Sequence, residues 1–74
     1  MVTIVASWDV RTAKAQVHMV LDSDTYDLDS RLSLAEAKVD ELEALYGEQP
    51  VEIVLASARS LEDFQKTDPR FYGV

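Results

Sequence analysis

Residues 33–56, SLAEAKVDELEALYGEQPVEIVLA, contain the change of hydrophobic period that decides the fold. As far as residue 46, apolar side chains recur at spacings of three and four, which is the period of one helix face. From Val51 the spacing falls to two, so that Val51, Ile53 and Leu55 share one side of a predicted strand. Gly47 and Pro50 separate the two patterns and are typical of a helix end. The predicted helical stripe consists of Leu32, Ala35, Val39, Leu42 and Tyr46.

The start of this helix is predicted from a capping pattern. Ser33 is followed three residues later by Glu36, and a hydroxyl and a carboxylate at this spacing can each accept a hydrogen bond from the free amides of a first helical turn. The sequence therefore predicts that the helix begins at Ser33.

Two strands are predicted before the helix. Residues 1–8, MVTIVASW, are rich in β-branched side chains, and residues 13–22, AKAQVHMVLD, alternate apolar and polar side chains. The polar break at residues 9–12 is short, which favours an antiparallel hairpin. In this alternation His18, the only histidine, falls on the polar face, so we expect it to face solvent.

After the third strand, residues 60–66, SLEDFQK, predict a second short helix capped by Ser60, and Pro69 prevents its continuation. The order is β-β-α-β-α in one domain, residues 1–74. A right-handed crossover from the second strand to the third predicts a small α+β fold, with a mainly antiparallel sheet of order 2-1-3 and the main helix on one face. Val5, Val20 and Val54 are predicted on the other face, where the second helix or a second copy of the chain would cover them. They are the predicted face of a homodimer.

Composition excludes several classes of function. The 74 residues carry a formal charge of −7 and no cysteine. The excess lies in residues 21–52, where ten acidic residues stand against Arg31 and Lys38 and give −8. Such a charge repels nucleic acids and anionic lipids. Because there is also no apolar run of membrane-spanning length and no leader pattern, we expect a cytoplasmic protein that binds neither nucleic acid directly nor membranes.

Residues 21–30, LDSDTYDLDS, raise the question of a metal site. A calcium loop that starts at Asp22 would need glycine at its sixth position and glutamate at its twelfth, but Asp27 and Ser33 stand there. We therefore predict no metal and no cofactor, with an irregular calcium site as the alternative. With one histidine and two glycines, the chain has neither a recognisable nucleophile–base set nor a phosphate-binding glycine loop. No catalytic residues are predicted, and the protein is not expected to be an enzyme.

The acids are instead interpreted as a binding surface. Glu36, Asp40 and Glu43 are spaced by four and three residues and so lie in one row along the helix, roughly in line with Asp29. The hypothesis is a small regulator or inhibitor that docks on a basic surface of a partner protein, such as a nucleic-acid-handling enzyme. An antitoxin or a phage-encoded anti-defence protein, acting by nucleic-acid mimicry, is its concrete version. A solvated acidic face that only keeps the chain soluble, within a structural homodimer, is the alternative. The predicted partner-binding residues are Asp22, Asp24, Tyr26, Asp27, Asp29, Glu36, Asp40 and Glu43.

The aromatic residues divide into two groups. Trp8 and Tyr46 fall within periodic segments and are expected in the core, whereas Tyr26 and residues 70–72, RFY, lie outside them. Aromatic residues and arginine are frequent anchors of interfaces. The alternative for Phe71 and Tyr72 is that they fold back over the core of a short chain.

Overall fold

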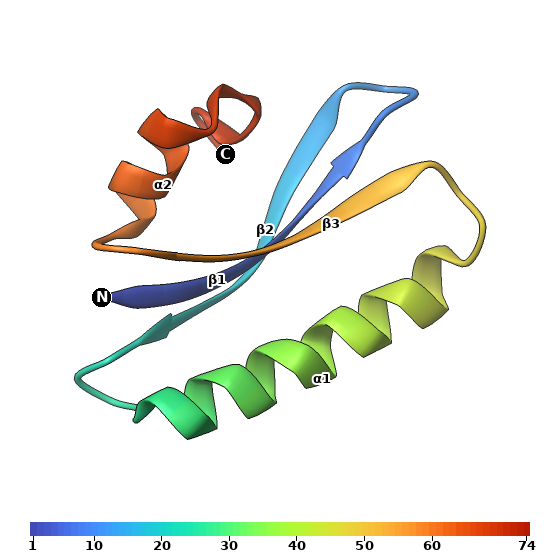
Figure 1. Ribbon diagram of the computed structural model, residues 1–74. Coiled ribbons are helices and arrows are strands. Elements are labelled where there is room, and N and C mark those ends of the chain that lie inside the picture. Colours follow the sequence, from blue (N-terminus) through green and yellow to red (C-terminus); the bar gives the residue numbers. More distant parts are fainter.

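A three-stranded sheet forms the middle layer of the protein (Figure 1). The computed structural model covers all residues from Met1 to Val74. The central strand is β1 (Val2–Asp9), flanked by β2 (Lys14–Asp22) and β3 (Val51–Ala58), and it is antiparallel to both. The strand order is β2-β1-β3, so β2 and β3 run parallel to each other and are joined by the crossover through α1 (Leu28–Tyr46). The predicted α+β fold and strand order are confirmed.

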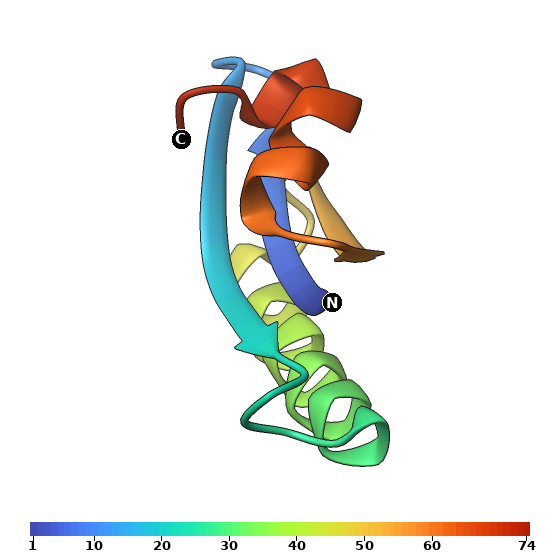
Figure 2. The same ribbon diagram turned by 90° about the vertical axis from the view of Figure 1, so that its left-hand side faces the viewer.

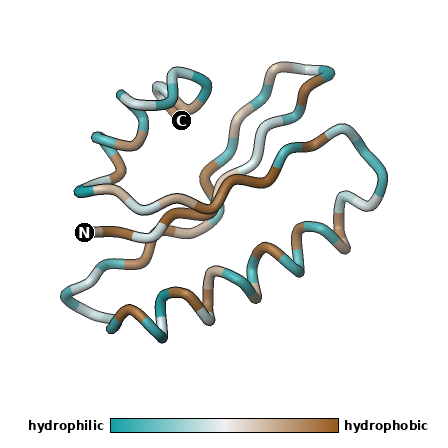
Figure 3. Tube along the Cα trace, viewed as in Figure 1, coloured by the Kyte–Doolittle hydropathy of each residue, from teal (hydrophilic) through white to brown (hydrophobic).

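Helical segments cover both faces of the sheet (Figures 1 and 2). The long helix α1 packs on one face, against a core of Val5, Ala35 and Leu42. The short helix α2 (Leu61–Thr67) and the 3-10 turn η1 (Pro69–Phe71) lie on the other face. The apolar residues gather where the strands cross the middle of the molecule (Figure 3). The core on the α2 side consists of Ile4, Ala6, Phe64 and Phe71, with Trp8 packed against it.

Strand β2 contains a bulge that the alternating sequence did not reveal. The register passes from Val5 opposite Met19 to Ala6 opposite Val17, which leaves His18 without a partner residue in β1. An extra residue of this kind reverses the faces of the residues on either side of it. His18 consequently turns toward α1, where it is half-buried. The prediction of a solvent-facing histidine is corrected by the bulge.

Helix α1 begins earlier than its capping pattern predicted. Its N-cap is Asp27, whose carboxylate accepts a hydrogen bond of 2.8 Å from the backbone N–H of Ser30. This hydrogen bond holds the pKa of Asp27 below its ordinary value. Ser33 lies inside the helix instead of at its start. The end is as predicted, because Gly47 has a positive φ of 57° and donates its backbone N–H to the carbonyl of Glu43.

The C-terminal segment folds onto the sheet. Ser60 caps α2 by accepting a hydrogen bond from the N–H of Asp63, as predicted. After Pro69 the chain turns so that Phe71 is fully buried, while the next residue, Tyr72, is exposed. No helix of this fold combines the length and the apolar character that a membrane crossing requires.

Candidate binding surface

Four carboxylates lie in one row along α1. The residues of α1 that are buried against the sheet, Arg31, Ala35 and Leu42, define its inner side. At 3.6 residues per turn, the four acids are rotated in the same sense by about 100° to 160° from that side, and so they share the outer flank of the helix. All four are exposed. They are Asp29, Glu36, Asp40 and Glu43, called the acidic row below.

The acidic row lies on the flank of α1 that is nearer β3. Lys38 is on the opposite flank, where its charge acts on His18 of β2. The direction of helix rotation agrees with this placement, because in a right-handed crossover from β2 to β3 the residues at this rotation point to the β3 side. The edge of the sheet formed by β3 is therefore the edge beside the acidic row.

No basic side chain of the protein neutralises the acidic row. The lysines and arginines that form ion pairs contact other carboxylates: Arg11 with Asp9, Lys38 with Glu41, Lys66 with Glu62, and Arg70 with both Glu52 and Asp68. The segment that carries most of the charge therefore keeps an uncompensated negative surface. Neighbouring like charges on a helix each cost a few tenths of a kcal/mol, so this arrangement does not arise from helix stability.

The aspartates before α1 have partly structural roles. Asp22 accepts a hydrogen bond of 2.8 Å from the N–H of Asp24, which closes a turn after β2. Asp27 is occupied as the cap of α1. Tyr26 is partly exposed, and its carbonyl accepts a hydrogen bond from Arg31. The structure thus brings the acidic row together, whereas Asp22, at the end of β2, and Asp24 and Asp27, in the loop that follows, lie at its N-terminal end. No group of three or more potential ligand side chains is placed to hold a metal ion.

Arg31 is a structural residue that the sequence did not identify. Its side chain is buried, and its Nε donates to Thr3 Oγ1 at 3.2 Å while its Nη1 donates to the carbonyl of Tyr26 at 2.8 Å. The guanidinium thereby ties the aspartate loop to β1. Because arginine is rarely buried, only the helical spacing of four residues to Ala35 could have indicated this position. Leu32, predicted in the buried stripe, is 37% exposed instead.

The predicted valine face does not exist as one surface. Val5 is fully buried beneath α1. Val20 and Val54 pair with Ile4 and Ala6 and so lie on the side of α2, where Val54 packs against the core. The second helix covers this face, which was one of the two expected outcomes. Of the three valines only Val20 is exposed, at 42%.

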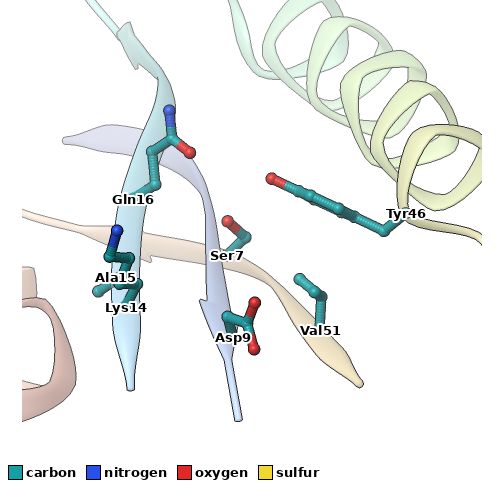
Figure 4. Close-up of a pocket in the computed structure, with 7 residues that line it drawn as sticks. All are labelled: Ser7, Asp9, Lys14, Ala15, Gln16, Tyr46 and Val51. Atoms are coloured by element: carbon teal, nitrogen blue, oxygen red, sulfur yellow. The ribbon is translucent and has the colours of Figure 1, made fainter. Parts of the chain in front are cut away.

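A cleft of about 350 Å³ lies between the C-terminal end of α1 and the β1–β2 hairpin. Figure 4 shows Tyr46 reaching from α1 toward Ser7 and Gln16. Beside the cleft, Ser7 Oγ lies 2.8 Å from His18 Nε2, a pairing that the bulge creates. No carboxylate is hydrogen-bonded to His18, and Ser7 is almost completely buried. The pair therefore lacks the orienting acid and the accessible hydroxyl of a nucleophilic site. The cleft is lined by Ser7, Asp9, Lys14, Ala15, Gln16, Tyr46 and Val51.

His18 is expected to make stability depend on pH. Its partial burial lowers its pKa below 6.5, the charge of Lys38 lowers it further, and Glu41 opposes the shift. The folded state then binds a proton less readily than the unfolded state. The resulting stabilisation is complete above the unfolded pKa and is lost as the pH falls through the folded one. Urea unfolding at about pH 7.5 and pH 5.5 should show wild type losing more stability on acidification than His18→Gln. Equal losses in the two proteins would contradict this assignment.

Comparison with known proteins does not place the chain in a family. No family model matches the chain, and no curated protein or solved structure is significantly similar to it. The uncompensated acidic row on one flank of α1 is therefore the feature of the molecule that points most directly to a function.

Proposed function

We propose that the protein is a non-catalytic regulator or inhibitor that binds a basic surface of a partner protein through the acidic row. The observation that carries this proposal is that four exposed carboxylates share one flank of α1 and none is paired with a lysine or arginine. Attraction between such a row and a basic surface favours rapid, correctly oriented association. The aspartate loop at the N-terminal end of α1 extends the same negative surface.

Enzymes that handle nucleic acids are the partner class that this surface fits best. Their binding sites are rich in lysine and arginine because they neutralise phosphates. The chain itself carries −7 and would be repelled by a nucleic acid. Its carboxylates, spaced along a rigid helix, are suited to occupy positions where such an enzyme otherwise holds phosphates. An antitoxin or a phage-encoded inhibitor is the biological form that this proposal takes.

The positions of the helices do not favour the alternative of a homodimer through an open sheet face. Helix α1 covers one face, while α2 and η1 cover the other. Val5, which was expected at that dimer face, has no exposed surface.

Charge reversal within the acidic row tests the proposal. Asp40→Lys with Glu43→Lys is compared with a matched control, Glu48→Lys with Glu62→Lys, which changes the net charge equally at exposed sites outside the row. Each protein is immobilised and exposed to a cell lysate at low salt, and the proteins that it captures are quantified by mass spectrometry. The measurement is repeated after a salt step to about 0.5 M, where exposed charges are strongly screened. We expect wild type and control to retain the same basic proteins, the row variant to lose them, and salt to release them.

The fold of both variants is checked first. Circular dichroism and thermal unfolding should show α1 intact in the row variant, because the substitutions turn the repulsion between positions 36 and 40 into an attraction and leave one like-charge pair, at positions 40 and 43, as before. Retention of the same basic proteins by the row variant would contradict the proposal, since the charge that defines the surface would then be dispensable.

A further inference from the structure

Strand β3 leaves one edge of the sheet open. It pairs only with β1. The N–H of Val10 donates to the carbonyl of Pro50, which sets the alternation of hydrogen-bonded pairs along the two strands. In this alternation the residues whose backbone N–H and C=O groups point away from β1 include Ile53, Leu55 and Ser57. These outward groups form a ready template for another strand.

The two edges of the sheet differ in their protection. On β2, the bulge at His18 interrupts the regular ladder, and bulges are a common means of blocking edge pairing. On β3, residues 51–58 contain no proline, no lysine and no bulge. The β3 edge is therefore the one that can accept an added strand without rearrangement.

The side chains near this edge indicate what kind of strand fits. Leu55 projects from β3 toward the α1 side and is 44% exposed, and Leu32 lies on the flank of α1 that faces the same edge. An added strand would run about 4.8 Å beyond β3, with every second side chain on the α1 side. Those side chains would lie beside Leu55, and long ones would extend toward Glu43 and Glu36, the two members of the acidic row that are rotated least from the sheet.

We infer that an extended segment of the partner adds to the β3 edge as a fourth strand, with lysine or arginine among the side chains that face α1. This inference rests on the proposed function, because the acidic row supplies the charge that selects the segment. Main-chain hydrogen bonds would provide affinity and the alternate side chains specificity, as in other cases of strand addition. The aliphatic stems of the basic side chains would pack on Leu55.

A second copy of the chain is a poorer occupant of the same edge. Antiparallel pairing of two β3 strands about a two-fold axis would place both α1 helices on one face of the joined sheet. Their β3 flanks would then face each other, so that one acidic row would oppose the other. Like charges in this arrangement repel, whereas a basic segment is complementary.

The test uses a nine-residue peptide that alternates lysine and valine, and a control peptide of the same sequence in which every backbone amide is N-methylated. The two peptides carry equal charge, but only the first can donate backbone hydrogen bonds to β3 from either of its edges. Binding to the intact protein is followed by calorimetry and by backbone amide NMR. We expect the first peptide to bind at least about tenfold more tightly, and the amides of Leu55 and Ser57 to become protected from exchange.

Protein variants separate this inference from the proposed function. Leu55→Pro removes an outward N–H, while Leu55→Thr shortens the same side chain and keeps that N–H. We expect Leu55→Pro to bind the first peptide no better than the N-methylated one and Leu55→Thr to keep the preference. Ser57→Pro serves the same purpose where Leu55→Pro does not fold.

Equal binding of both peptides, abolished by the Asp40→Lys and Glu43→Lys pair, would overturn strand addition and leave the proposed function standing. Failure of that pair to affect either peptide would count against both. A wild-type dimer in sedimentation that Leu55→Pro converts to a monomer would assign the edge to a second copy of the chain and overturn the inference.

Discussion

Replacing Phe71 with alanine is expected to lower the free energy of unfolding by about 3–5 kcal/mol, the range found for fully buried phenylalanines. Phe71 has no exposed surface, and its ring centroid lies 5.1 Å from that of Phe64. Domains of this length have total stabilities of roughly 4–11 kcal/mol, so the substitution should remove a large part of the stability. Urea denaturation followed by circular dichroism measures the difference.

The adjacent residue provides a matched control. Tyr72 is 77% exposed, and Tyr72→Ala should change the free energy of unfolding by no more than about 0.5 kcal/mol, as is usual for surface positions. Similar losses in the two variants would show that the C-terminal turn is not docked as described. Within residues 70–72, only Phe71 folds back into the core, while Arg70 pairs with Asp68 and Glu52.

Much of the fold follows from signals that are local in the sequence. The change of period at Gly47 and Pro50 separates α1 from β3, and both features act within a few residues of the chain. The strand order needed one further rule, the handedness of the crossover, which applies to any strand–helix–strand unit. Neither step depends on how particular side chains pack.

The differences arise where distant residues decide the outcome. The bulge at His18 depends on how β2 fits β1, and the sequence of β2 alternates almost strictly, with Val20 as the one apolar residue on its polar side. The buried position of Arg31 depends on Thr3 and Tyr26, which satisfy its guanidinium. For the start of α1, Asp27 and Ser33 are both good caps, and Asp27 is the cap in the structure.

The candidate surface was predictable from the sequence only where it depends on local spacing. The spacing of Glu36, Asp40 and Glu43 places them in one row on any helix. Which flank of α1 faces β3 depends on how the helix packs on the sheet, which buries Arg31, Ala35 and Leu42. The open β3 edge could not be recognised from the sequence, because the difference between the two edges depends on the bulge in β2.

Introducing a carboxylate at Val5 is expected to prevent folding near neutral pH. Val5 lies in the core beneath α1 with Ala35 and Leu42, and it has no exposed surface. A glutamate there would have no basic partner, and burying such a charge costs more than most point mutations do, beyond about 4–5 kcal/mol. Because this cost is comparable with the total stability of a short domain, Val5→Glu should lack a cooperative thermal transition in circular dichroism.

Val20→Glu makes the same chemical change on the neighbouring strand, at a position that is 42% exposed. Its carboxylate can stay hydrated, so the fold should survive with a loss of about 1 kcal/mol or less. Had the valines formed an exposed dimer face, both variants would fold and both would be monomers. A folded, monomeric Val5→Glu protein would thus show that α1 does not cover the face of the sheet that carries Val5. An unfolded Val5→Glu protein beside a folded Val20→Glu protein is the result expected when α1 covers that face.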